Sequence, residues 1–105
     1  MITTHVLDTA QGRPAAGVAV TLEKRERDGW LEIGRGATDA DGRLKTLWPS
    51  GTPLAAGTFR LRFDTSARSE FFPEVNIVFQ VREGGGHFHV PLLLAPYGYS
   101  TYRGS

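Results

Sequence analysis

Short runs of β-branched and aromatic residues, separated by glycine and proline, constrain the fold of this chain more than any other feature. The 13 glycines and 6 prolines are spread along the sequence, so they punctuate short elements and do not form a linker. Seven such runs lie at residues 2–7, 18–24, 30–34, 58–63, 75–81, 87–94 and 97–102. Their spacing predicts an all-β sandwich or barrel.

Two of these runs alternate between apolar and polar residues. In 18–23, valine and leucine alternate with alanine, threonine and glutamate, and in 58–63, phenylalanine and leucine alternate with threonine and arginine. Successive side chains of a strand point to opposite faces, so each run is predicted to be a half-buried strand. A short helix is compatible with 65–72, where Pro73 would end it. We therefore expect seven or eight strands and one helical turn.

Length, charge and composition exclude several classes of protein. A chain of 105 residues is expected to form one domain, 1–105, around a single core. The net charge of +1 comes from evenly mixed charges without a basic stripe, so we expect no nucleic-acid partner. No apolar run approaches the ~20 residues of a spanning helix, so no membrane partner is expected. No secretory signal is visible, which favours a cytoplasmic protein.

The three histidines are few and unusually placed. His5 lies inside the first run, and His87 and His89 flank Phe88 in a strongly apolar run. Residues two apart in a strand share a face, so these two histidines should project together while Phe88 enters the opposite layer. Three interpretations stay open: hydrogen-bonded surface residues, a zinc site, and acid–base catalysis near neutral pH.

Motifs for metals and for protein nucleophiles are missing from the sequence. Without cysteine or a His-Glu-x-x-His pattern, we expect no metal and no other cofactor. Without a Gly-x-Ser-x-Gly motif, the nucleophile of any enzymatic reaction should be water. Segment 38–43 lacks the third acidic position and the final glutamate of a calcium loop, which favours a hairpin turn before Arg43.

Two glycine- or tyrosine-rich segments complete the pattern. The three glycines at 84–86 are expected to reverse the chain, because they lack the strand-then-helix context of a phosphate-binding loop. The aromatic residues of 97–102 predict a docked strand instead of a frayed tail.

Four segments together carry a resemblance to a known family. They are Thr-His-Val-Leu-Asp at 4–8, Thr-Asp-Ala-Asp-Gly-Arg at 38–43, His-Phe-His-Val-Pro-Leu-Leu-Leu at 87–94 and Tyr-Arg-Gly-Ser at 102–105. The chain closely resembles the transthyretin-like proteins and, within them, the 5-hydroxyisourate hydrolases. Transthyretin shares the Val-Leu-Asp and Pro-Tyr-x-Tyr-Ser-Thr segments but lacks these histidines and the Tyr-Arg-Gly-Ser ending.

The resemblance implies a fold, an assembly and a set of site residues. The fold would be a transthyretin-type sandwich of two four-stranded sheets with one short helix, assembled as a homotetramer (a dimer of dimers) with its sites in the channel between dimers. The catalytic residues of the family fall on His5, Arg43 and His89. Substrate binding falls on Tyr102, Arg103, Gly104, Ser105 and, in a supporting role, His87.

The implied reaction is the hydrolysis of 5-hydroxyisourate to 2-oxo-4-hydroxy-4-carboxy-5-ureidoimidazoline in urate degradation. His5 and His89 would position and deprotonate water, and Arg43 would stabilise the oxyanion. Ser105 could act through its hydroxyl or its terminal carboxylate. The alternative is a carrier of a small aromatic ligand in the tetramer channel, which the polar site residues disfavour because an apolar ligand needs a dry channel.

Overall fold

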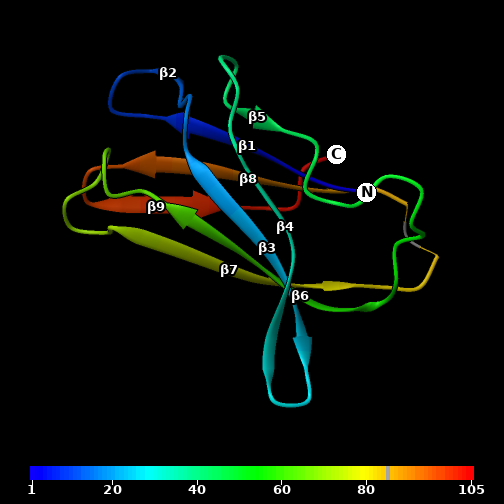
Figure 1. The fold of residues 1–105 in the computed structure, drawn as a ribbon. Coiled ribbons are helices and arrows are strands. Elements are labelled where there is room, and N and C mark those ends of the chain that lie inside the picture. The colour runs from blue at the N-terminus through cyan, green and yellow to red at the C-terminus, as the bar shows by residue number, and fades with distance from the viewer. Residues whose placement is uncertain (85) are drawn as a thin grey trace.

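The computed structural model describes residues 1–84 and 86–105, and in these residues it contains strands and no helix. The strands pack as two layers (Figure 1). Their bounds are β1 (Ile2–Asp8), β2 (Arg13–Pro14), β3 (Ala19–Glu26), β4 (Gly29–Ala37), β5 (Arg43–Leu44), β6 (Gly57–Asp64), β7 (Glu74–Val81), β8 (Phe88–Ala95) and β9 (Gly98–Thr101). No helix in the described residues is long and apolar enough to cross a membrane.

Each layer is one sheet. The first sheet has the order β2-β1-β8-β9, and the second has the order β4-β3-β6-β7. In the first sheet, β2 pairs with the end of β1, and β5 pairs with Thr4 and His5 in its middle. Strands β1 and β8 are parallel neighbours at the centre of the first sheet, with Thr3 opposite His89. The first strand and the last two strands of the chain thus lie side by side in one sheet, while β3, β4, β6 and β7 form the other.

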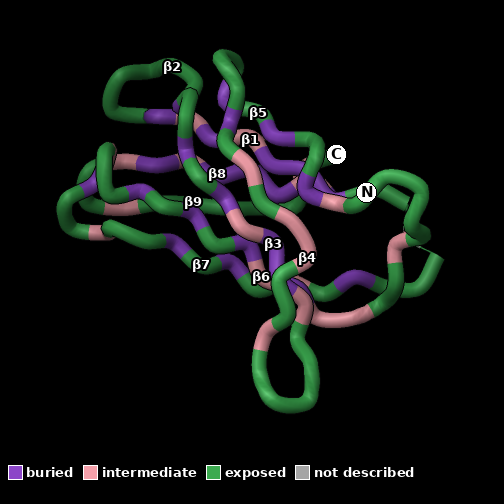
Figure 2. The backbone as a smooth tube through the Cα atoms, in the orientation of Figure 1, coloured by how far each residue is buried: buried purple, intermediate pink, exposed green. Residues whose placement is uncertain are grey.

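The core lies between the two sheets, where the inward faces of the strands meet (Figure 2). Strand β6 contributes Phe59, Leu61 and Phe63, all completely buried, and β1 contributes Ile2 and Val6. Burying a large apolar side chain stabilises the folded state by about 1.5–3 kcal/mol. The strict alternation of 58–63 therefore reflects one face packed in this core and one face toward solvent, as predicted.

Most of the predicted architecture is confirmed. Each of the seven predicted runs overlaps one strand, and the sandwich has two sheets. The count of strands differs, because β2 and β5 are two-residue strands without a periodic pattern of their own. Both pair with β1, and the first sheet consequently has five strands where four were expected.

The predicted short helix at 65–72 is wrong. The segment makes a single turn, in which the Ser69 amide donates to the Thr65 carbonyl at 2.8 Å. After this turn, hydrogen bonds of side-chain hydroxyls replace those of a helix. The Thr65 hydroxyl donates to the Phe72 carbonyl, and the Phe72 amide donates to Ser69 Oγ. Hydroxyl side chains compete with helical hydrogen bonds in this way, so the helix does not continue.

The turn predicted at 38–43 is present and leads into β5, but it is not a hairpin, because β4 pairs with β3 in the second sheet and β5 pairs with β1 in the first. The Asp39 carboxylate accepts hydrogen bonds from the amides of Asp41 and Arg43, both at 2.9 Å. Gly42 adopts a φ of 76°, and a Cβ there would lie 2.4 Å from the Val6 carbonyl oxygen. Only glycine fits this position, so the turn is held tightly against β1. The reversal predicted at 84–86 includes Gly85, which lies outside the described residues.

Candidate functional site

A cavity of about 320 Å³ opens on the outer face of the first sheet. It lies over β1, β5 and the start of β8. Its lining residues are Met1, Thr3, Thr4, Arg43, Lys45, His87, His89 and Ser105. In the part of the chain that the structure describes, no aspartate or glutamate is among them, and the charged side chains of the lining are those of Arg43 and Lys45.

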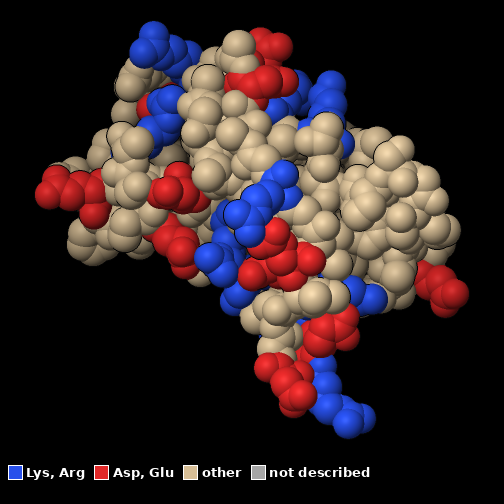
Figure 3. Space-filling model, in the orientation of Figure 1, with Lys and Arg blue, Asp and Glu red and all other residues tan. Residues whose placement is uncertain are grey.

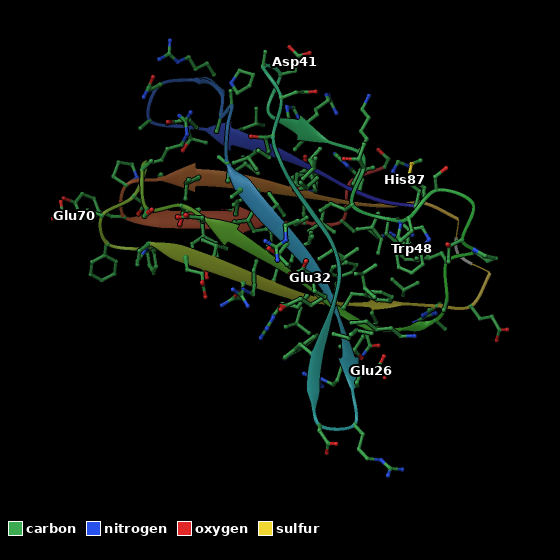
Figure 4. The ribbon with its side chains drawn as sticks, in the orientation of Figure 1. Glu26, Glu32, Asp41, Trp48, Glu70 and His87 are labelled. Carbon is green, nitrogen blue, oxygen red and sulfur yellow. The ribbon has the colours of Figure 1, made fainter. Side chains whose placement is uncertain are left out.

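The parallel pairing of β1 with β8 places two histidines in this cavity. Phe88 is 5% exposed and packs in the core, so His87 and His89 project together from the opposite face, as predicted. The Thr3 Oγ1 lies 2.9 Å from His87 Nε2 and 2.7 Å from His89 Nδ1. One hydroxyl thus joins both imidazoles. Figure 4 labels His87, which lies beside the start of β1.

The pairing of β1 with β5 brings two more predicted residues together. His5 and Arg43 are directly opposite in the register, although they are far apart in sequence. The Nε2 of His5 lies 2.8 Å from the Asp41 carbonyl oxygen, which can only accept, so this nitrogen carries a proton. The preceding turn fixes the backbone of Arg43, while its side chain remains exposed toward the cavity.

Electrostatics favour a neutral imidazole at His89. Burial lowers the pKa of His89 below its ordinary value of 6.5, and the nearby Arg43, His87 and His5 lower it further. Both causes act in the same direction, because a cationic imidazole is poorly solvated there and is repelled by its neighbours. His89 is therefore a neutral base at pH 7, the form that can accept a proton.

The end of the chain closes one side of the site. The Gly104 amide donates to the His89 carbonyl oxygen at 2.8 Å, which forms an isolated antiparallel bridge. A Cβ on Gly104 would lie 2.5 Å from His89 Cδ2 and 3.2 Å from Pro91 Cγ. The absence of a side chain lets the backbone pass directly against the imidazole ring and brings Ser105 into the cavity.

Tyr102 and Arg103 lie in a different place. They line a second cavity of about 250 Å³, between β7, β8 and β9. The guanidinium carbon of Arg103 is 4.6 Å from the ring centroid of Phe88, a cation–π arrangement. The tail thus divides its side chains between two cavities, with Tyr102 and Arg103 in one and Ser105 in the other.

The sequence-predicted site residues are thus divided by the fold. Arg43, His87, His89 and Ser105 line one cavity, Gly104 packs against His89, and His5 lies opposite Arg43. Thr3 and Lys45 also line this cavity, and neither was predicted from the sequence. Thr3 carried a usable signal, because it lies two residues before His5 in the same strand and therefore on the same face.

A metal site is not formed by the residues that the structure describes. Nowhere in these residues do three or more histidine, aspartate or glutamate side chains gather in an arrangement that could hold a metal ion. His87 and His89 instead share a hydroxyl.

The family assignment rests on a match along almost the whole chain. Residues 2–104 match the model of the HIUase/Transthyretin family. The chain belongs to this family. A 5-hydroxyisourate hydrolase of Salmonella dublin is 45% identical over 100% of this chain and 81% of its own length.

Two solved structures of family members share the fold. The 5-hydroxyisourate hydrolase of Klebsiella pneumoniae superposes with a TM-score of 0.83 at 38% identity, over 99% of this chain and 97% of that one. Sea bream transthyretin, solved in complex with thyroxine, superposes with a TM-score of 0.87 at 32% identity, over 98% of this chain and 93% of that one. Backbone shape is thus common to both branches of the family, and side chains must distinguish them.

Proposed function

We propose that this protein hydrolyses 5-hydroxyisourate to 2-oxo-4-hydroxy-4-carboxy-5-ureidoimidazoline in urate degradation. The observation that carries the proposal is the cavity in which His87 and His89 share the Thr3 hydroxyl next to Arg43. The full-length similarity to a Salmonella dublin protein named for this activity supports it. A planar, oxygen-rich bicycle suits a cavity that offers cations and hydrogen-bond donors and contains no carboxylate of Asp or Glu in its described lining.

The alternative within the family is a carrier of a small aromatic ligand. The fold alone does not distinguish a carrier from a hydrolase, because the sea bream transthyretin structure superposes on this chain as well as the hydrolase structure does. The lining does favour the hydrolase. An apolar ligand would have to strip water from Arg43, Lys45 and the two histidines, and burying such groups without polar partners is unfavourable.

The proposed chemistry assigns one role to each group. Water attacks a carbonyl carbon of the six-membered ring, and a proton of this water passes to His89. His5 helps to position the water. The carbonyl oxygen becomes an oxyanion, which Arg43 stabilises. The ring C–N bond then breaks, and the departing nitrogen takes the proton from His89. General-base assistance contributes about 10² to 10⁴ in rate, and an oxyanion donor contributes about 10² to 10³.

The tail is proposed to bind substrate and to shape the site. Ser105 would contact the substrate or the water, and Gly104 would hold His89 in place through the backbone bridge. Arg103 over Phe88, together with Tyr102 in the second cavity, would anchor the tail so that its last residues reach the site. His87 would support His89 through Thr3.

We also propose a homotetramer that encloses this site between dimers. The cavity is open on the outer face of a sheet, so a facing subunit would exclude water from the reaction. Large apolar side chains on the surface support association, with Phe71 66% and Tyr97 82% exposed near the β9 edge. Light scattering coupled to size-exclusion chromatography should give four times the mass of the chain, and a monomer would contradict the proposal.

The activity is tested directly by ultraviolet absorbance. Freshly generated 5-hydroxyisourate should decay faster with the wild-type protein than without it, and the rate should be unaffected by a chelator. The double variant His89→Ala/Arg43→Ala should lose this acceleration, while the matched control Arg35→Ala, on the exposed edge strand β4, should retain it. Acceleration that survives in the double variant, or that a chelator abolishes and zinc restores, would overturn this mechanism.

A further inference from the structure

The Thr3 hydroxyl lies between the two imidazoles of the candidate site. The residue is on the outer face of β1, yet it is only 4% exposed. Its Oγ1 is within hydrogen-bond distance of a nitrogen from each of two imidazoles, at 2.9 Å and 2.7 Å. Buried hydroxyls need partners, but a backbone carbonyl would serve this need, as it does for the neighbouring Thr4.

A hydroxyl between two imidazole nitrogens couples their protonation states. It has one proton to donate and lone pairs with which to accept. At most one of His87 Nε2 and His89 Nδ1 can receive this proton, so the other nitrogen must carry its own. A neutral His89 can therefore exist as Nδ1–H, donating to Thr3, or as Nε2–H, accepting from it.

The surroundings of His89 favour the first of these forms. Its Nδ1 contacts Thr3, its Cδ2 edge lies against Gly104, and no described residue hydrogen-bonds to its Nε2. Arg43 and Lys45 line the same cavity. A lone pair on Nε2 is attracted by such cations, whereas an N–H in that position would be repelled.

We propose that Thr3 is a positioning residue that holds the proton of His89 on Nδ1, which leaves Nε2 free to act as the base, and that links His89 to His87. The expected effect on kcat rests on the proposed function, whereas the position of the His89 proton does not. In the resting state His89 Nδ1–H donates to Thr3, and the Thr3 hydroxyl donates to His87 Nε2.

The same link can transfer positive charge from His89 to His87. After Nε2 takes the proton of water, the Nδ1 proton can pass to Thr3 Oγ1 while the hydroxyl proton of Thr3 passes to His87 Nε2. His89 and Thr3 are then neutral again, and the charge resides on His87 until the two protons move back through Thr3 and His89 protonates the departing ring nitrogen. Burial and the charge of Arg43 both disfavour a cationic His89, whereas His87 is the less buried of the two imidazoles within the chain, so the charge is less unfavourable on His87.

The test uses two variants of Thr3 and one matched control. Thr3→Val keeps the shape and removes the hydroxyl, and it should lower kcat at least about tenfold with KM nearly unchanged. Thr3→Ser keeps the hydroxyl and should restore most of kcat. The control Thr58→Val removes a hydroxyl that bonds to Gln80 on the second sheet, and kcat should stay at the wild-type value.

A spectroscopic readout separates a proton-holding role from a merely structural one. Long-range ¹⁵N–¹H correlation spectra of the imidazoles distinguish Nδ1–H from Nε2–H. At a pH where His89 is neutral, the wild type should show Nδ1–H, and Thr3→Val should shift His89 toward Nε2–H while Thr3→Ser should not.

The outcomes distinguish this inference from the proposed function. A wild-type protein with His89 as Nε2–H would overturn the inference even if Thr3→Val did not fold, and so would a Thr3→Val variant with unchanged kcat and unchanged tautomer. A wild type that shows Nδ1–H, with the shift in Thr3→Val, but does not hydrolyse 5-hydroxyisourate would support the role of Thr3 and refute the proposed reaction.

Discussion

The outer faces of the two sheets both carry charged side chains, but they use them in opposite ways. On the second sheet, the buried Glu23 carboxylate lies 2.6 Å from Arg60 and 3.2 Å from Arg62, and Glu32 pairs with Arg35 at 2.7 Å. Blue and red atoms accordingly alternate along the middle of the face in Figure 3. On the first sheet, in the residues that the structure describes, no carboxylate is within salt-bridge distance of Arg43.

This difference indicates where the molecule retains binding capacity. Paired charges satisfy one another within the folded chain, so the second face contributes to stability and offers little to a ligand. Unpaired cations beside two linked imidazoles remain available to an anionic or developing negative charge. The pattern of pairing, more than the number of charges, separates a structural face from a candidate active site.

The strongest test of this comparison replaces one arginine on each face. Arg43→Gln should lower kcat by about 10² to 10³, because it removes the proposed oxyanion donor. The residual activity should also change with pH. Since Arg43 lowers the pKa of His89, its removal raises that pKa, and the loss of activity on acidification should begin at a higher pH than in the wild type. Steady-state kinetics across pH 5 to 8, a range about the ordinary histidine pKa, measure both effects.

The matched control for this test is Arg62→Gln on β6, which removes a guanidinium of the same type from the paired face. Its kcat and its pH profile should match the wild type. Equal losses in the two variants would show that the distinction between the faces has no functional meaning.

A second test examines the contact that closes the site. Gly104→Ala places a methyl group where the His89 ring lies, so the ring or the tail must move, and kcat should fall about tenfold or more, as small displacements of catalytic groups commonly do. Gly98→Ala is the control, because a Cβ there meets no atom within 4 Å. An unchanged kcat in Gly104→Ala would show that the position of the tail against His89 is not needed.

The smallest effect on activity is expected on the paired face itself. Glu23→Gln removes a carboxylate that is only 7% exposed and holds two arginines, and it should lower the free energy of unfolding by about 1–3 kcal/mol. Chemical denaturation measures this loss, while kcat should stay at the wild-type value. The exposed pair Glu32–Arg35 provides the contrast, since Arg35→Gln should leave the unfolding midpoint unchanged. A loss of activity in Glu23→Gln at full folding would contradict the separation of roles.

Much of the fold could be predicted from local patterns. The alternation of 58–63 identified a strand with one buried face, and the pair His87 and His89 was placed on one face by the same rule. The two-residue strands β2 and β5 carry no period and were missed. The segment 65–72 was taken for a helix because its hydroxyl-mediated hydrogen bonds are not visible as a pattern.

The local patterns of the sequence by themselves determined an all-β sandwich or barrel with two histidines on one strand face, because alternation and turn residues are local properties that the backbone geometry enforces. The resemblance of its motifs supplied the family. Tertiary structure alone decided which distant groups meet. Thr3 meets His89 across 86 positions of sequence only because β1 and β8 pair in parallel. Arg103 lies over Phe88, and the Gly104 backbone passes against the His89 ring. Such meetings depend on strand register and close packing, which no local pattern encodes.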